Sequence, residues 1–493
     1  MPGGTDGSTG IKISALNLWV SRFVLLLAFY CLAAVSCSER IFVEENSPSL
    51  TFSDDTIHFD TVFTSIGTIT KEFRVYNQYN RWLKIDRIFL GGGTSSPFRL
   101  NIDGEPTIDV SGVELAPGDS IFIFVDVIID PLGEDNPVAI LDSVVFIAGN
   151  SLQSVNLLAW GQDIHLVSGE ITGTTTWGND KPWVIHNSVL VDTGEILTVE
   201  AGARVLFHRG STMYVAGTLL VRGEYENSVL FSSDRTEEEY NEIPGQWGGI
   251  YFINSSYGNT IDNAVIKNAV SGIHLGNIDS FDEPPDLVIS NSVIRNMTVS
   301  GLSSLGANIS ANNCEISHCG FFNLFLAMGG SYSFAHCTVA GTWEYSARTT
   351  PSVLISDYYD YNTIRYKGEL LSAHFINSVI YGTGEGEIAI LPQLDSEVLN
   401  CSFGYSLITI DEGNSYWDNY DLSTDLVNGD PQFIGFSDLD FRPDTLSVLT
   451  GTADRSVSLI YPSDLRGFNR FMDEGPDIGA YERQPGEKRA SSK

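Results

Sequence analysis

The stretch "FINSVIYG", residues 375–382, contains a unit that recurs through the second half of the chain. The unit is an asparagine, a small residue and, two positions further on, a branched apolar residue, with variants such as "DNAVIKN", "SNSVIRN", "NNCEISH" and "LNCSFGY". The aligned positions lie at intervals of 28, 22, 23, 41 and 23 residues, and they are Asn263, Asn291, Asn313, His336, Asn377 and Asn400. Self-similarity at such a period is typical of a solenoid.

A period of about 22 residues without a helical pattern favours a parallel β-solenoid, in which coils of short strands stack about 4.8 Å apart. Asparagine tolerates the left-handed backbone of a tight bend, and its amide can pair with amides above and below. The pattern therefore predicts a ladder of Asn263, Asn291, Asn313, Asn377 and Asn400. The interval of 41 leaves two alternatives open: one coil with an insertion, or two short coils with "SDYYDYN" (356–362) in the second.

The upstream sequence "WVIHNSVLVDTGEILTVEAGARVLFHRG" has strands and Gly turns in the same style. It resembles the opening coils of right-handed parallel β-helix proteins of the pectate-lyase-like superfamily. The resemblance implies a β-helix over residues 170–428. Residues 429–485, with "DPQF", "DLRGFNR" and "GPDIGAYE", resemble a terminal segment of bacterial β-helix proteins and are expected to cap the solenoid, because the last coil has unpaired edges. Residues 486–493 are expected to be a disordered tail.

Residues 45–165 contain alternating strands such as "IHFDTVF", "TKEFRVYN" and "DSIFIFVDVII", separated by turn signals. Several short alternating strands at this spacing predict a β-sandwich. The segment resembles the immunoglobulin-like modules related to major sperm protein, and this implies a spacer or adhesive unit without catalytic residues. The expected fold class is therefore all-β, with an immunoglobulin-like sandwich followed by a right-handed parallel β-helix.

Residues 1–37 have the features of an export signal. Lys12 and Arg22 precede the apolar run Phe23–Val35, which is short for a spanning helix. The end of the run, "AVSC", resembles the bacterial lipobox, in which the peptide is cut before the cysteine and the cysteine is acylated. The resemblance implies lipidation of Cys37 and an exported protein anchored at the bacterial outer membrane or cell surface. A plain secretory cleavage and an uncut anchor are the alternatives.

The net charge of −35 argues against nucleic acid as a partner, because an acidic surface repels phosphates. The acidic stretch "DEGNSYWDNYDLSTD" (411–425) could hold calcium, but it lacks the ligand spacing of an EF-hand and is more simply a solvated loop. His318 and Cys319 fall near a bend, yet the sequence has no CxxC or HExxH pattern. No metal site and no obligatory cofactor are predicted.

Two sets of side chains are candidates for function. Lys267 and Arg295 follow the inward isoleucine on neighbouring coils and should project outward one above the other, as weak catalytic candidates or as an exposed ladder pair. Tyr358, Tyr359 and Tyr361 lie in an aromatic-rich stretch and could stack on sugar rings.

The expected function is therefore that of an exported, lipid-anchored surface protein whose β-helix binds glycan or another extracellular component without catalysis. One alternative is a polysaccharide lyase or glycoside hydrolase that acts on an acidic polysaccharide. Another is a purely structural surface protein.

Overall fold

The structure is a computed structural model that describes residues 40–171, 173–254, 256–278, 284–394, 397–473 and 475–484. The proposed signal peptide, Cys37 and the tail 486–493 lie outside the described residues. The chain divides into two compact units: one holds most of the residues up to 158, and the other holds residues 59–66, 129–140 and 159 onwards. In the described part of the chain, no helix has the length and apolarity required to cross a membrane.

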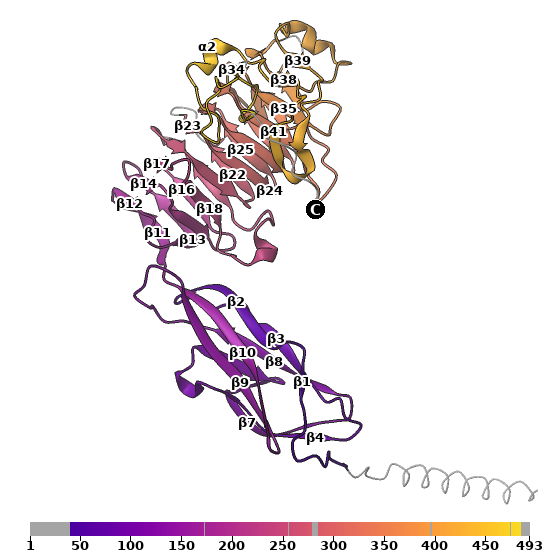
Figure 1. Cartoon of the computed structure of the whole chain (residues 1–493). Coiled ribbons are helices and arrows are strands. Elements are labelled where there is room, and N and C mark those ends of the chain that lie inside the picture. Colours follow the sequence, from indigo (N-terminus) through magenta and orange to yellow (C-terminus); the bar gives the residue numbers. More distant parts are fainter. Residues whose placement is uncertain are drawn as a thin grey trace, which may run out of the picture. The chain divides into compact units, whose positions relative to one another are not determined.

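The first unit is a sandwich of two antiparallel sheets, because its strands alternate buried apolar residues with less buried ones, as in β8 (Ser120–Val127). The first sheet has the order β1 (Thr51–Phe52), β3 (Lys71–Tyr76), β8, β5 (Phe98–Ile102) and β6 (Glu105–Pro106). The second has the order β2 (Thr56–Phe63), β10 (Ser151–Gln162), β9 (Val138–Ala148), β4 (Leu83–Leu90) and β7 (Asp109–Leu115). This is the predicted immunoglobulin-like module (Figure 1).

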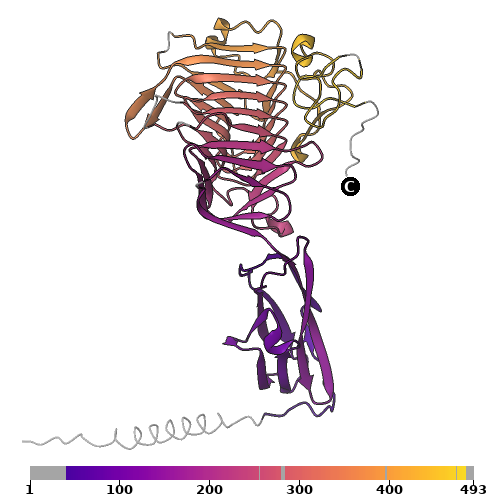
Figure 2. The same ribbon diagram turned by 90° about the vertical axis from the view of Figure 1, so that its left-hand side faces the viewer.

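The second unit is a parallel β-helix whose coils have up to three strands, which lie on three faces that we call A, B and C (Figure 2). Face A is a nine-stranded parallel sheet: β12 (Thr175–Trp177), β14 (Ile196–Glu200), β17 (Thr218–Arg222), β20 (Thr260–Asp262), β23 (Asp286–Ser290), β26 (Asn308–Asn312), β29 (Gly330–Ala335), β34 (Leu370–Ile376) and β37 (Cys401–Gly404). Faces B and C together form an 18-stranded sheet.

Face B follows face A along each coil, and face C follows face B. The strands of face B are β11 (His165–Ile171), β13 (Trp183–Val191), β15 (Arg204–Phe207), β18 (Val229–Ser233), β21 (Ala264–Lys267), β24 (Val293–Met297), β27 (Glu315–Cys319), β30 (Thr338–Gly341), β35 (Val379–Gly382), β38 (Leu407–Ile408) and β39 (Leu426–Val427). The strands of face C are β16 (Thr212–Val215), β19 (Gly249–Phe252), β22 (Ser271–Leu275), β25 (Ser300–Leu305), β28 (Phe322–Ala327), β31 (Val353–Ser356) and β36 (Ile388–Leu391). The predicted fold class, a sandwich followed by a parallel β-helix, is confirmed.

The bend between faces A and B, which we call the first corner, holds the recurring asparagine. Its residues have left-handed backbone: Asn263 (φ 50°), Asn291 (φ 48°), Asn313 (φ 50°), His336 (φ 51°), Asn377 (φ 52°) and Tyr405 (φ 48°). The Asn313 amide donates to Oδ1 of Asn291 at 3.1 Å, and the Asn291 amide donates to Asp262 at 2.8 Å. Ile266, Ile294 and Ile316 pair in register behind this corner and are fully buried. Stacking therefore explains why the unit recurs.

Asn400 is not a member of this ladder. Ile376 pairs with Gly404, so the residue that follows Asn377 in the column is Tyr405. Asn400 instead precedes β37, and its amide donates to the carbonyl of Leu371. This corrects the alignment by five residues: "GYSLI", with its buried serine and isoleucine, is the true repeat unit, and "LNCSF" belongs to face A.

The interval of 41 residues is one coil with an insertion. Ala335 pairs directly with Ile376, so His336 and Asn377 are adjacent in the first corner. The extra residues form a loop at 342–352 and the antiparallel hairpin of β32 (Tyr358–Tyr361) and β33 (Ile364–Lys367). The second alternative, two short coils, is therefore excluded.

The C-terminal segment, residues 429–484, packs along the first corner, beside the stacked coils (Figure 2). It contains β40 (Phe433–Gly435), β41 (Asp440–Pro443) and the short helix α2 (Arg455–Ser458). The fully buried Arg470 donates to Asn313 at 3.0 Å, and the backbone N–H of Asp454 donates to Asn377 at 2.7 Å. The ladder amides thus have two roles: they hydrogen-bond to one another between coils, and they hydrogen-bond to the C-terminal segment.

A separate stretch covers the apolar interior at the last coil. Trp417, in the 3-10 turn η3 (Ser415–Asn419), is 8% exposed and its ring centroid lies 5.8 Å from that of Phe403. The Tyr416 hydroxyl donates to the Glu397 carbonyl at 2.9 Å. Trp417, in the acidic stretch 411–425, therefore helps to cover the apolar core at the last coil.

Candidate functional site

A second bend, between faces B and C, also forms a column of residues, which we call the second corner. Register places Asn268, Asn296, His318, Gly341 and Gly382 one above another. The Asn296 amide donates to Oδ1 of Asn268 at 2.6 Å, so the column begins as a second asparagine ladder. The signal was present in the sequence five residues after Asn263 and Asn291, in "NAVIKN" and "NSVIRN", but sequence reasoning missed it.

The upper end of the second corner is built around a buried ion pair. Nη2 of Arg348 lies 2.7 Å from one oxygen of Glu387 and 2.8 Å from the other, and the two side chains are 5% and 0% exposed. A Cβ at Gly341 would lie 2.1 Å from Oγ of Ser352, and one at Gly382 would lie 2.2 Å from the Glu387 carboxylate. Glycine is therefore required in these two slots, because the ion pair occupies the space of a side chain.

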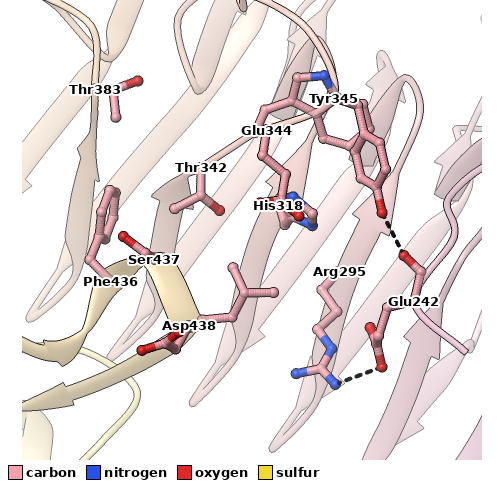
Figure 3. Close-up of a pocket in the computed structure, with 12 residues that line it drawn as sticks. Glu242, Arg295, His318, Thr342, Glu344, Tyr345, Thr383, Phe436, Ser437 and Asp438 are labelled. Atoms are coloured by element: carbon pink, nitrogen blue, oxygen red, sulfur yellow. Dashed lines mark hydrogen bonds and ion pairs between the residues drawn. The ribbon is translucent and has the colours of Figure 1, made fainter. Parts of the chain in front are cut away.

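A cavity of about 480 Å³ opens at the second corner, beside His318, and we call it the corner pocket. It is lined by Glu242, Arg295, His318, Thr342, Trp343, Glu344, Tyr345, Thr383, Phe436, Ser437, Asp438 and Leu439. Figure 3 shows Tyr345 and Glu242 on one side of the pocket and the C-terminal residues Phe436, Ser437 and Asp438 on the other. The pocket is therefore built from coil residues, from the loops that carry Glu242 and Tyr345, and from the C-terminal segment, which lie far apart in the sequence.

His318 lies at the floor of the pocket with φ 52° and 6% exposure. Its ring centroid lies 5.2 Å from that of Trp343 and 5.8 Å from that of Tyr345. Among the described residues no hydrogen-bond partner reaches its buried Nδ1, and the same holds for the buried hydroxyl of Thr342. Burial lowers the pKa of His318, although Glu344 and Glu242 oppose the shift, so the ring is neutral near pH 7.

The tyrosine in this pocket is held by the loop opposite. The Tyr345 hydroxyl donates to the Glu242 carbonyl at 2.9 Å, and Tyr345 is 51% exposed. The indole of Trp343 donates to Ser346 at 3.0 Å, and its ring centroid lies 5.0 Å from that of Tyr345. Two aromatic rings, one half-buried and one exposed, are thus held beside polar groups.

The weak catalytic candidates, Lys267 and Arg295, do stack in register, but neither is a free cation. Nζ of Lys267 lies 2.9 Å from Oε1 of Glu242 and 2.7 Å from Oδ1 of Asn241, and Lys267 is 8% exposed. Nη2 of Arg295 lies 3.7 Å from the same Glu242 oxygen (Figure 3). The pair holds the loop that carries Glu242, and Arg295 alone reaches the pocket.

The three predicted ligand-binding tyrosines are on the β32–β33 hairpin, and none of them lines the corner pocket. The Arg365 guanidinium lies over the Tyr358 ring at 3.9 Å. Tyr359 packs edge-on against Phe325 with a centroid distance of 5.9 Å, and Tyr361 is 47% exposed. They therefore belong to the hairpin that follows β31 of face C.

The C-terminal wall of the pocket is tied to face B by a buried acid. Glu315 is 2% exposed and accepts hydrogen bonds from the hydroxyls of Ser317, at 2.7 Å, and Tyr481. Burial raises the pKa of Glu315 above its usual range, while the two hydrogen bonds and Arg295 oppose the shift. Sequence reasoning found no sign of this contact, because it joins residues 166 positions apart.

The described residues contain no group of three histidine, cysteine or acidic side chains that could hold a metal ion. Cys314, Cys319, Cys337 and Cys401 are free and buried. Burial raises the pKa of each of Cys314, Cys319 and Cys401, so these thiols act as small apolar residues.

No protein-family model matches the sequence, and no curated protein matches it. Among solved structures, the ASH/PapD-like domain of human CEP192 (PapD-like domain 7) is similar to part of the chain, at 11% identity and a TM-score of 0.18, over 26% of this chain and 96% of that chain. A family 123 glycoside hydrolase from Clostridium perfringens, described for glycolipid glycan hydrolysis, is similar at 5% identity and a TM-score of 0.19, over 25% of this chain and 30% of that chain. Likenesses this weak carry no argument about function.

Proposed function

We propose that this chain is an exported, lipid-anchored member of the pectate-lyase-like β-helix superfamily that binds a glycan in the corner pocket without turnover. The anchor is Cys37, as the "AVSC" sequence favours. The observation that carries the binding proposal is the combination of aromatic faces and unpaired polar groups in one cavity: Trp343 and Tyr345 beside His318 and Thr342. Sugars present apolar ring faces and many hydroxyl groups, and such a surface matches both features.

The charges of the pocket favour a neutral sugar over an acidic one. Three carboxylates line it, on Glu242, Glu344 and Asp438, against one guanidinium, that of Arg295. Arg295 is already paired with Glu242, and His318 is neutral, so no uncompensated cation remains among the lining residues to bind a uronate. Carboxylates accept hydrogen bonds from sugar hydroxyls, which suits a neutral ligand.

Calorimetric titration of the mature chain with neutral oligosaccharides from a glycan array tests the proposal. We expect Trp343→Ala and Tyr345→Ala each to weaken binding about tenfold, since each removes a ring contact of about 1–2 kcal/mol. Tyr225→Ala is the matched control, because Tyr225 is 53% exposed and does not line the pocket. Unchanged affinity in both pocket variants would refute the site. Labelling of cells with palmitate, compared with Cys37→Ala, tests the anchor.

A glycoside hydrolase is the second candidate, and the three carboxylates of the pocket favour it. Hydrolysis needs two carboxyl groups on either side of the scissile bond. Release of reducing ends from a bound glycan, abolished in Glu344→Gln or Asp438→Asn, would establish this activity. A lyase is less well supported, because Lys267 and Arg295 are both engaged by Glu242 and neither is free to neutralise a sugar carboxylate.

A further inference from the structure

Face C differs from the rest of this acidic chain in its composition. Its seven strands, β16, β19, β22, β25, β28, β31 and β36, contain no Asp, Glu, Lys or Arg. The ends of β11 and β13 extend onto this face and add Glu170, which lies in register with Leu190 and Tyr214. Charged residues make up 18% of the whole sequence, and the neighbouring strands of face B include Lys267, Arg295 and Glu315. Burial explains the lack of charge only for the inward-facing residues, and about half the residues of a strand point outward.

The outward column of face C is largely aromatic. Register stacks Tyr214 on Tyr251, Tyr251 on His274, His274 on Ser303 and Ser303 on Phe325. The ring centroids of Tyr214 and Tyr251 lie 5.8 Å apart, and those of Tyr251 and His274 lie 5.1 Å apart. We call this column, together with Tyr359 and Tyr361 on the hairpin, the aromatic strip.

The two ends of the strip are exposed, while Tyr251, His274 and Phe325 between them are half-buried. Tyr214 is 42% exposed at one end and Tyr361 is 47% exposed at the other. His274 is fixed by Ser303 at 2.8 Å and by the Gly276 carbonyl at 3.0 Å. Burial lowers the pKa of His274, so its ring stays neutral and adds no charge to the strip.

We propose that the aromatic strip is a second contact surface, along which a neutral linear polysaccharide lies parallel to the β-helix axis. The proposal rests on the proposed function and extends it from a single sugar site to a polymer. Two features of the strip favour this occupant. It is one column wide, and Tyr214, Tyr251 and His274 place a ring on three successive coils before Ser303 interrupts the column. Such a narrow row of rings matches a linear polymer of sugar rings, whereas a protein partner needs a broad patch of about 800 Å². It carries no cation in a chain of net charge −35, which disfavours a polyanion.

The test compares short and long ligands on the full mature chain. The probes are soluble β-glucan, xylan and mannan, each as the polymer and as its trisaccharide. The variants are Tyr214→Ser with Tyr251→Ser for the strip, Trp343→Ala for the corner pocket and Tyr225→Ser as control. We expect the strip variant to bind the polymer at least about tenfold more weakly and the trisaccharide as the wild type does. Trp343→Ala should weaken both ligands.

The outcomes separate the two proposals. If the strip variant binds the polymer with the same affinity as the wild type, the proposal for the strip is wrong, even if Trp343→Ala no longer binds the polymer. Loss of polymer binding in the strip variant with no effect of Trp343→Ala supports the strip and overturns the pocket. Binding of none of the probes overturns both. A wild-type dimer that becomes a monomer in the strip variant, measured by sedimentation, also overturns the strip, because the rings would then bind a second copy. Circular dichroism and melting curves confirm that each variant is folded.

Discussion

Removal of the Glu387 carboxylate should be among the most damaging single changes in the β-helix. In Glu387→Ala, the Arg348 guanidinium loses both carboxylate contacts, at 2.7 and 2.8 Å, while its side chain remains 5% exposed. The backbone N–H groups of Ser352 and Gly384 lose their acceptor as well. Breaking a buried pair by removing one partner costs about 3–5 kcal/mol, so we expect a loss of that size in the free energy of unfolding of the β-helix.

The assay is urea unfolding followed by circular dichroism, with the change read from the midpoint of the β-helix transition. Asp360→Ala is the control, because Asp360 pairs with Arg365 at the surface, where the two side chains are 54% and 41% exposed, and should cost less than about 1 kcal/mol. The double variant Arg348→Met with Glu387→Leu should recover much of the loss, since it leaves no unpaired charge. A cost for Glu387→Ala equal to that of Asp360→Ala would refute the reasoning.

Three further predictions concern the ladder and the end of the core. Asn313→Ala should lower the free energy of unfolding in urea by about 2–4 kcal/mol, since it removes three hydrogen bonds of a buried side chain at a left-handed position. Asn400→Ala should lower it by less than about 1 kcal/mol, and equal losses would contradict the corrected alignment. Trp417→Ala should cost about 3–5 kcal/mol and increase aggregation measured by light scattering, and an unchanged midpoint would show that it does not close the core. Burial places the pKa of His336 well below 6.5, so the unfolded state takes up a proton first and the stability of the folded protein falls as the pH drops below about 6.5. His336→Asn should make the melting temperature less dependent on pH. The same dependence of melting temperature on pH in both proteins would exclude the histidine as its cause.

The repeat could be predicted because every stacked coil has the same bend and therefore favours the same residue types at it. The recurring unit identifies Asn291, Asn313 and Asn377, and each has the left-handed backbone that a tight bend needs. The error at Asn400 arose because "LNC" imitates the unit, while the true corner residue, Tyr405, carries no asparagine to mark it. The residue type at one position does not determine how β37 aligns with β34, because the hydrogen bonds between the two coils set that register.

The corner pocket could not be predicted in the same way. Apart from Arg295, His318 and Thr383, its residues come from an insertion near 240, another at 342–345 and the C-terminal residues 436–439, and no periodic pattern links them. Arg295 and His318 were both noted in the sequence, but their partners Glu242 and Trp343 became neighbours only through stacking of the coils. The aromatic strip could not be predicted for another reason. Tyr214, Tyr251 and His274 are 37 and 23 positions apart, and only the register between the coils shows that they stack in one column.

The most direct measurement is a crystal structure of the mature chain soaked with hexasaccharides of β-glucan, xylan and mannan. The account predicts a sugar ring stacked in the corner pocket on Trp343 or Tyr345, with its hydroxyl groups within hydrogen-bond distance of His318 or Thr342. Sugar bound only elsewhere, or an empty corner pocket at saturating hexasaccharide, would contradict it.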